Sequence, residues 1–253
     1  MINTLKEAIR KGNPTVGAGI TINSSRVAAV LAHTKFDWIW IDLEHGFIDL
    51  ETAYELVQAT KGTSCVPLVR VPANEDWLIK QALDLGAYGI IVPLVRSAKD
   101  VSRAVSASKY PPEGIRGVSS GFAANGWGIS VAEYWRICND ELVRIIQVED
   151  LQAIERIEEI MATPGLDMVF IGTGDLSGAV GCIGEPNHPK VEEQIDKVLQ
   201  ASRKLKIPIG IVATNSRDIN RRTQQGFTFF LAGTDAAMMI QGAVGALNGV
   251  CFK

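Results

Sequence analysis

In this 253-residue chain, charged and amide side chains lie near the ends of four apolar stretches, either within the last residues of a stretch or just after it. They are His45 after WIWIDL, Arg70 in VPLVRV, Gln147 and Glu149 in VRIIQVE, and Asp175 after MVFIGT. Burying such groups beside an apolar strand is costly unless they serve one another, a metal ion or a ligand. Their positions therefore indicate one shared site.

The acidic pair Glu149 and Asp175 offers hard oxygen donors, with no cysteine or second histidine beside them. Such donors favour Mg²⁺, Mn²⁺ or Co²⁺ in a partly hydrated octahedral site over a structural zinc. A 2-oxo acid can fill the remaining positions, because its carboxylate and keto oxygens close a five-membered ring with the ion. We expect a divalent cation that holds the negative charge developing on the keto oxygen as an enolate forms.

Two further residues suit the same reaction. Arg70 can place a second positive charge by the keto oxygen. His45 has an unperturbed pKa of about 6.5, which suits a base near neutral pH. A Schiff-base aldolase would instead need a lysine inside the fold. No lysine lies within an apolar stretch of this chain, and Lys206 only precedes one.

Eight stretches rich in Val, Ile, Leu and Phe can position these residues, because such runs are typical of strands buried on both faces of a parallel sheet. The predicted strands are TVGAGI (15–20), WIWIDL (38–43), VPLVRV (66–71), GIIVPLV (89–95), VRIIQVE (143–149), MVFIGT (168–173), IPIGIVA (207–213) and TFFLAGT (228–234). They recur about every 32 residues, the span of one βα unit. The sequence predicts an α/β fold, a (βα)8 TIM barrel formed by residues 1–253 as a single domain. The polar residues then lie at its C-terminal rim, where such barrels place their chemistry.

Helix signals lie between these strands. One helix is predicted over 50–60 with Asp49 as its N-cap, and another over 75–87, opened by Asn74 and stopped by Gly86. The final segment, 235–249, is apolar on nearly every side. A surface helix of a monomeric barrel keeps a polar face, so we expect this helix to pack on a neighbouring subunit of a homo-oligomer.

Each site residue also has a structural interpretation. Asp175 can cap the helix that follows it, and Gln147 can be a buried amide satisfied by its neighbours. Arg70 and Glu149 can form an ion pair across the barrel mouth. Four strands nevertheless deliver polar groups to one rim, and this convergence favours a functional site.

Composition excludes several classes of protein. The chain is 47% hydrophobic, which is ample for a large core, and its net charge of -3 leaves no basic patch for nucleic acid. No stretch approaches the ~18 apolar residues that span a bilayer, and the N-terminus lacks the apolar run of a signal peptide. The four scattered cysteines indicate reduced thiols. We expect a soluble, cytoplasmic protein with no membrane partner.

Five segments then carry a family resemblance. FDWIWIDLEHGFIDLE, VPLVRVPANE, YPPEGIRGVS, QVED and VFIGTGDLSGAVG, in this order, resemble the metal-dependent pyruvate aldolases of the HpcH/HpaI type, which cleave 4-hydroxy-2-oxoheptanedioate or 2-dehydro-3-deoxy-galactarate. The resemblance covers almost the whole chain. It implies a (βα)8 barrel whose last helix is exchanged between subunits, usually in a hexamer. It also implies a class II, metal-dependent aldehyde-lyase that reversibly cleaves a 4-hydroxy-2-oxo acid to pyruvate and an aldehyde.

The resemblance implies roles for three catalytic residues. His45 would be the base, Asp84 would raise its basicity, and Arg70 would stabilise the transition state. The role of Asp84 comes from the resemblance alone, because its place in LIKQALDLGA indicates a solvated helix residue.

Metal and substrate contacts are implied in the same way. Glu149 and Asp175 would hold the metal. The residues implied to contact the pyruvate part are Gln147, Gly172, Gly174 and Asp175. Many relatives have Gly-Pro-Ala/Ser-Asp-Leu where this chain has Gly172-Thr173-Gly174-Asp175, and glycine adds backbone freedom there. Relatives that act on acidic substrates often carry an arginine near Ala123, so its absence leaves the aldehyde open.

Two alternatives remain. The same barrel can serve an acyl-CoA or phosphoenolpyruvate-type lyase, although coenzyme A would need a basic rim and this chain offers only Arg70 and Arg116. It can also be a non-catalytic barrel that binds a 2-oxo acid, an alternative that the substituted Thr173-Gly174 pair leaves open.

Overall fold

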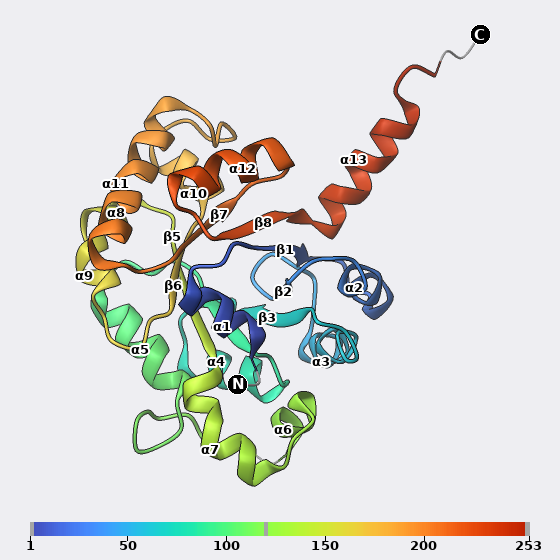
Figure 1. Ribbon diagram of the computed structural model, residues 1–253, viewed down its shortest axis with the longest axis vertical. Coiled ribbons are helices and arrows are strands. Elements are labelled where there is room, and N and C mark those ends of the chain that lie inside the picture. Colours follow the sequence, from blue (N-terminus) through green and yellow to red (C-terminus); the bar gives the residue numbers. More distant parts are fainter. Residues whose placement is uncertain (1–2, 119–120, 251–253) are drawn as a thin grey trace.

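The computed structural model describes residues 3–118 and 121–250, in which eight parallel strands pair in sequence order and close into a barrel (Figure 1). The strands are β1 (Thr15–Ile20), β2 (Trp38–Asp42), β3 (Val66–Arg70), β4 (Gly89–Val92), β5 (Val143–Val148), β6 (Met168–Ile171), β7 (Ile209–Val212) and β8 (Phe229–Thr234). All the predicted strands are present, with ends within three residues of those predicted. The predicted (βα)8 barrel is confirmed.

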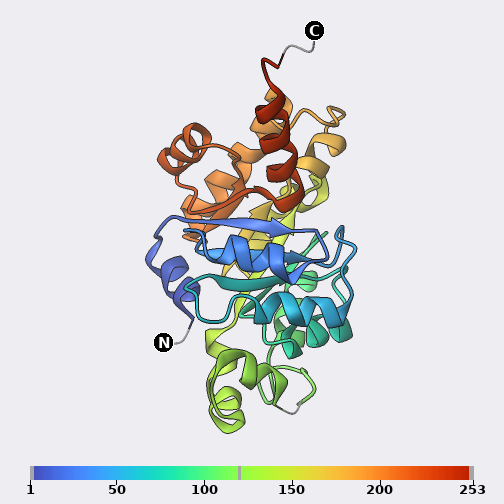
Figure 2. The ribbon, with the colours of Figure 1, turned by 90° about the vertical axis from the view of Figure 1, so that its right-hand side faces the viewer.

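Most helices follow a strand and pack around the barrel, whereas the first helix precedes all the strands and the last one extends away from the barrel (Figures 1 and 2). The helices are α1 (Thr4–Lys11), α2 (Ser25–Ala32), α3 (Leu50–Gln58), α4 (Asp76–Asp84), α5 (Ala98–Ser108), α6 (Phe122–Trp127), α7 (Val131–Glu141), α8 (Leu151–Glu155), α9 (Ile157–Met161), α10 (Thr173–Ala179), α11 (Pro189–Leu205), α12 (Ser216–Gln225) and α13 (Asp235–Leu247). None of these helices is long and apolar enough to cross a membrane.

Aromatic side chains fill the barrel interior below its C-terminal rim. Trp38 and Phe229 stack with ring centroids 3.9 Å apart, and Trp40 meets Phe170 edge to face at 5.0 Å. Gly17 permits this packing, because a β-carbon there would stand 2.1 Å from the Trp38 ring. The interior is therefore a packed core, and the polar residues further along these strands lie at the rim.

The predicted helix boundaries are partly confirmed. The Asp49 carboxylate accepts a hydrogen bond from Thr52 N at 2.8 Å and caps α3, and Gly86 takes a φ of +93° just after α4. The Asn74 prediction is wrong, since Glu75 occupies the N-cap position of α4. The Asn74 side chain instead donates to the Asp100 carbonyl oxygen at 2.9 Å and ties this loop to α5.

The last helix extends away from the barrel, as Figure 1 shows at its upper right. Its large apolar side chains face solvent in the single chain, with exposed fractions of 62% for Met239, 64% for Ile240 and 63% for Val244. Exposure of this kind marks surfaces that bind another molecule. Packing of α13 on a neighbouring subunit remains a prediction.

Candidate active site

A cavity of about 180 Å³ opens at the C-terminal ends of the strands. Of the residues that the sequence predicts for the site, all except Asp84 line this cavity: His45, Arg70, Gln147, Glu149, Gly172, Gly174 and Asp175. The barrel topology explains the gathering, because the carboxyl ends of parallel strands meet at one rim.

Arg70, the last residue of β3, is held in a fixed position. Its Nε donates to Asp42 Oδ1 at 2.9 Å, and its Nη2 donates to Asp42 Oδ2. Its Nη1 lies 3.0 Å from Glu44 Oε2, and the guanidinium sits 5.0 Å from the centre of the Trp40 ring. A two-point contact with one carboxylate and a second carboxylate at the third nitrogen restrict the guanidinium plane.

Gln147 joins Arg70 to Glu149. Arg70 Nη1 donates to Gln147 Oε1 at 3.2 Å, and Gln147 Nε2 donates to Glu149 Oε2 at 3.0 Å. The structural interpretation of Gln147 as a satisfied buried amide is therefore confirmed as part of its role. The alternative ion pair between Arg70 and Glu149 is wrong, because the amide lies between them and the arginine pairs with Asp42 and Glu44 instead.

The Glu149 carboxylate is buried at the end of β5. Burial is the main cause that raises its pKa to about 7, and the nearby Glu44 and Asp175 carboxylates act in the same direction. The backbone N–H of Leu94, which donates to Oε1 at 2.7 Å, acts in the opposite direction. A carboxylate that is desolvated and surrounded by like charge is stabilised by a cation.

Asp175 lies in the first turn of α10 and lines the cavity. Gly172 holds the N-cap position of this helix, and no side chain caps it in the part of the chain that the structure describes. The interpretation of Asp175 as a helix cap is therefore wrong. Its carboxylate faces the same cavity as Glu149.

The glycines before Asp175 differ in what they require. A β-carbon at Gly172 would stand 2.5 Å from Glu149 Oε2, whereas one at Gly174 would have no other atom within 4 Å. Gly172 is thus needed to make room for the Glu149 carboxylate. Gly174 adds open space beside the cavity.

His45 lies in the loop after β2, at the mouth of the cavity. Its backbone N–H donates to Asp42 Oδ1 at 3.2 Å, and its Nε2 lies 3.8 Å from Glu44 Oε2. Its side chain is 65% exposed. The imidazole is therefore open to solvent and lies beside a carboxylate.

Asp84 does not join this site in the chain described. It ends α4, and its Oδ1 accepts a hydrogen bond from Arg116 Nη2 at 2.8 Å. Arg116 is buried, with its guanidinium 4.5 Å from the centre of the Tyr110 ring and its Nη1 3.0 Å from the Tyr134 hydroxyl. The role of Asp84 toward His45 stays a prediction. Arg116, counted with Arg70 as a possible cation of the rim, does not lie at the rim, because its side chain is enclosed by these partners. This adds to the argument against a coenzyme A substrate.

Sequence reasoning missed two acidic residues of the site, Asp42 and Glu44. Asp42 lies two residues after Trp40 and four after Trp38 in β2, so its side chain points to the same side of the strand, into the barrel mouth. This alternation could be read from the sequence. Glu44 follows the strand and has no such signal. Together they anchor Arg70.

The donors present fit a divalent cation. Asp42, Glu149 and Asp175 line the cavity together with Arg70, so carboxylates outnumber the guanidinium. Within 3–118 and 121–250, no three or more His, Cys, Asp or Glu side chains are grouped to hold an ion. Glu149 and Asp175 would therefore need water and a chelating substrate to complete a shell, in accordance with hard-cation chemistry.

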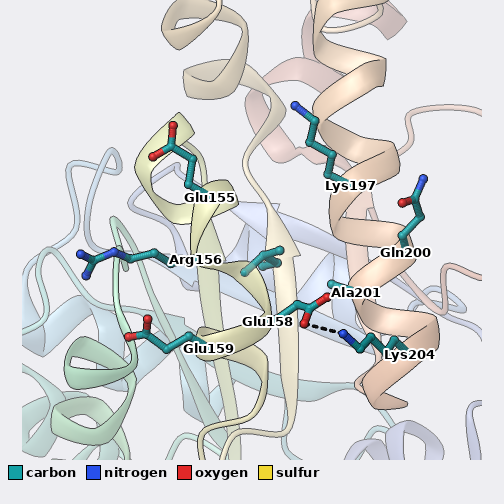
Figure 3. Close-up of a pocket in the computed structure, with 9 residues that line it drawn as sticks. Glu155, Arg156, Glu158, Glu159, Lys197, Gln200, Ala201 and Lys204 are labelled. Carbon is teal, nitrogen blue, oxygen red and sulfur yellow. Dashed lines mark hydrogen bonds and ion pairs between the residues drawn. The ribbon is translucent and has the colours of Figure 1, made fainter.

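A larger cavity of about 630 Å³ lies between α8, α9 and α11 (Figure 3). Glu158 and Lys204 form an ion pair of 2.7 Å across it, and Figure 3 shows the side chains of Glu155, Arg156 and Lys197 pointing in different directions. Because its charged groups do not converge, size alone does not make it the site of chemistry.

The closed barrel and its rim cavity place the protein in the class of (βα)8-barrel enzymes. The family model for HpcH/HpaI aldolase/citrate lyase matches residues 20–242, and the chain belongs to that family. The protein is thus a lyase of the aldolase type, in agreement with the resemblance seen in the sequence.

Named relatives agree with this assignment. The chain is 36% identical over 235 residues to a 2-dehydro-3,6-dideoxy-6-sulfogluconate aldolase of Pseudomonas putida, covering 93% of this chain and 92% of the relative. It is 35% identical over 233 residues to a 5-keto-4-deoxy-D-glucarate aldolase of Shigella boydii, covering 92% and 90%. The crystal structure of an HpcH/HpaI aldolase/citrate lyase family protein from Burkholderia cenocepacia superposes with a TM-score of 0.91 at 31% identity, over 97% of this chain and 98% of the other.

Proposed function

We propose that the protein is a divalent-metal-dependent aldolase that reversibly cleaves a 4-hydroxy-2-oxo acid to pyruvate and an aldehyde. The observation that carries the proposal is the meeting of Glu149, Asp175, Arg70 and His45 around one small cavity. Relatives whose names describe keto-deoxy acid aldolases support the substrate class.

Glu149 and Asp175 are the residues that would hold Mg²⁺, Mn²⁺ or Co²⁺. When bound, such an ion supplies a Lewis acid for the 2-oxo acid group. Gln147 orients the Glu149 carboxylate through its amide, and it can turn part of its hydrogen-bonding capacity toward the substrate. Gly172 and Gly174 keep side chains away from the place where the substrate carboxylate would lie.

Arg70 and His45 perform the proton and charge steps. His45 accepts the proton of the C4 hydroxyl, and the C3–C4 bond then breaks to release the aldehyde. The Arg70 guanidinium, fixed by Asp42 and Glu44, stabilises the enolate of pyruvate until it is protonated. Because His45 is exposed at the cavity mouth, it can return its proton to solvent.

The proposal also includes the oligomeric state and the cellular location of the enzyme. The exposed apolar side chains of α13 support a homo-oligomer, and the family resemblance suggests a hexamer. The free thiols of Cys65, Cys138 and Cys182 support a cytoplasmic location. Cys251, also predicted to be reduced, lies outside the described residues.

The test is a screen in the synthesis direction, with pyruvate and a panel of aldehydes in the presence of Mg²⁺, Mn²⁺ or Co²⁺. Product formation is expected with at least one aldehyde, and His45→Ala and Glu149→Ala should each abolish it with an unchanged circular dichroism spectrum. Arg103→Ala, at a side chain that is 43% exposed, serves as the control. Binding of pyruvate without turnover across the panel would favour a non-catalytic barrel.

A further inference from the structure

One wall of the cavity is formed by β7, β8 and β1, and it is uncharged, unlike the remaining walls. Its residues, called the neutral arc here, are Val212, Leu231, Thr234 and Gly19. None of these side chains carries a charge. The charged residues of the cavity come instead from the ends of β2, β3, β5 and β6 and the segments that follow them.

We infer that the neutral arc receives the aldehyde half of the substrate, and that this aldehyde is short and uncharged. The inference rests on the proposed function, and it adds the chemical class of the aldehyde. The C4 hydroxyl belongs to the aldehyde half, and His45, its proposed base, follows β2. Strand β1 pairs with β2 on one side, with Gly19 opposite Trp40, and with β8 on the other. The aldehyde half therefore extends from His45 toward β1 and β8, while the pyruvate half faces β5 and β6.

Charge argues against an acidic aldehyde. Among the described residues that line the cavity, Arg70 is the permanently cationic side chain, and it is already paired with Asp42 and Glu44. The other charged groups, Glu149 and Asp175, are carboxylates. The proposed metal ion lies on the side of Glu149 and Asp175, with the pyruvate half. A second anionic group, on the aldehyde half, would lie along the neutral arc, which offers no cationic side chain to pair with it, and this is unfavourable in a partly desolvated cavity.

Size and hydrogen bonding define the aldehyde further. The cavity of about 180 Å³ is well below the size of sites that take drug-sized ligands, about 300–1,000 Å³. The Thr234 oxygen accepts a hydrogen bond from Ala237 N at 3.2 Å, so its O–H can donate to a neutral oxygen of the ligand. Val212 and Leu231 offer aliphatic contact beside it. These groups suit a short hydroxyaldehyde or alkyl aldehyde.

The test compares two aldehydes of equal carbon number, neutral glycolaldehyde and anionic glyoxylate, as partners for pyruvate with Mn²⁺ present. The wild-type enzyme should show a kcat/KM for glycolaldehyde at least about tenfold above that for glyoxylate. Leu231→Arg adds a cation to the neutral arc and should lower this ratio about tenfold or more. Leu231→Met, of similar size without a charge, should keep the ratio close to that of the wild type.

Exchange of the pyruvate methyl protons with deuterium, followed by NMR without aldehyde, reports the pyruvate half separately. Exchange together with preference for glycolaldehyde supports the inference. Exchange together with equal or better use of glyoxylate by the wild type overturns it and leaves the proposed function intact. Absence of exchange with Mg²⁺, Mn²⁺ and Co²⁺ overturns the proposed function and this inference with it. The wild-type comparison decides the question even where Leu231→Arg does not fold.

Discussion

The backbone of Gly172 lies directly against the carboxylate of Glu149. A β-carbon at Gly172 would stand 2.5 Å from Glu149 Oε2 and 2.8 Å from the Glu149 β-carbon. The carboxylate cannot move away freely, because Leu94 N and Gln147 Nε2 both donate to it. Glycine is therefore required here by the position of an acidic side chain.

Gly172→Ala should displace the Glu149 carboxylate and weaken Mn²⁺ binding by about tenfold or more, since metal sites depend on oriented ligands. Isothermal titration calorimetry with Mn²⁺ measures the change. Gly178→Ala is the matched control, because a β-carbon there meets no atom within 4 Å. Wild-type affinity in Gly172→Ala would contradict the placement of the ion at Glu149.

Proton and cation should compete at Glu149. Burial raises the pKa of this carboxyl from 4.5 to about 7, so the group is mostly ionised at pH 8 and mostly protonated at pH 6. Because only the ionised form binds a cation, Mn²⁺ affinity should fall about tenfold as the pH falls from 8 to 6. Electron paramagnetic resonance of free Mn²⁺ measures the dissociation constant at each pH. Equal affinities at the two pH values would show that Glu149 is not a ligand, and Glu149→Gln gives the reference without this carboxyl.

Asp84→Asn tests what Asp84 does. Its carboxylate pairs with Arg116, whose side chain is 0% exposed, so the variant leaves a buried guanidinium short of its partner. The free energy of unfolding should fall by about 2 kcal/mol, as measured by urea denaturation. Glu113→Gln removes an exposed carboxylate that pairs with Lys109, and it should lower the free energy of unfolding much less than Asp84→Asn does. Unchanged stability with a shifted pH profile of activity would assign Asp84 to His45 instead.

The helix α13 should hold subunits together. Its exposed Ile240 and Val244 are expected to lie at a subunit interface, so the double variant Ile240→Asp, Val244→Asp should dissociate the oligomer. Light scattering at micromolar concentration measures the mass of both forms. Gln241→Glu, a charge change at an exposed polar residue of the same helix, should leave the mass unchanged. A monomeric wild-type protein would end this prediction.

The strands could be predicted because strands buried on both faces consist of nearly continuous apolar residues. The strand ends could be predicted because polar residues interrupt these apolar runs there. Arg70, Gln147 and Glu149 occupy positions whose side chains face the barrel interior, and this alternation was sufficient to predict that they meet at one rim. Their individual hydrogen bonds could not be predicted, since pairing across a barrel depends on stagger and side-chain length. For this reason Glu149 was considered as the partner of Arg70, whereas the structure shows Asp42 in that place. No role was predicted for Asp42, although its side chain points to the same side of the strand as that of Trp40.

Predictions from local sequence, such as a helix cap, were wrong where contacts with distant parts of the chain determine the position of the side chain. Asn74 has a capping side chain, but the neighbouring helix offers it the Asp100 carbonyl group, and Glu75 takes the cap position. Arg116 was counted with Arg70 as a possible cation of the rim, although Tyr110 and Tyr134 enclose it. In both cases a distant segment of the chain decides where the side chain lies.

Deuterium exchange at the pyruvate methyl group, measured before and after removal of divalent cations with a chelator, tests the central claim most directly. Exchange should cease in protein whose metal content has been verified as negligible, and should return when Mn²⁺ is added to the wild type but not to Glu149→Ala. Exchange at the full rate in the chelated wild-type protein would contradict a metal-dependent reaction at Glu149 and Asp175.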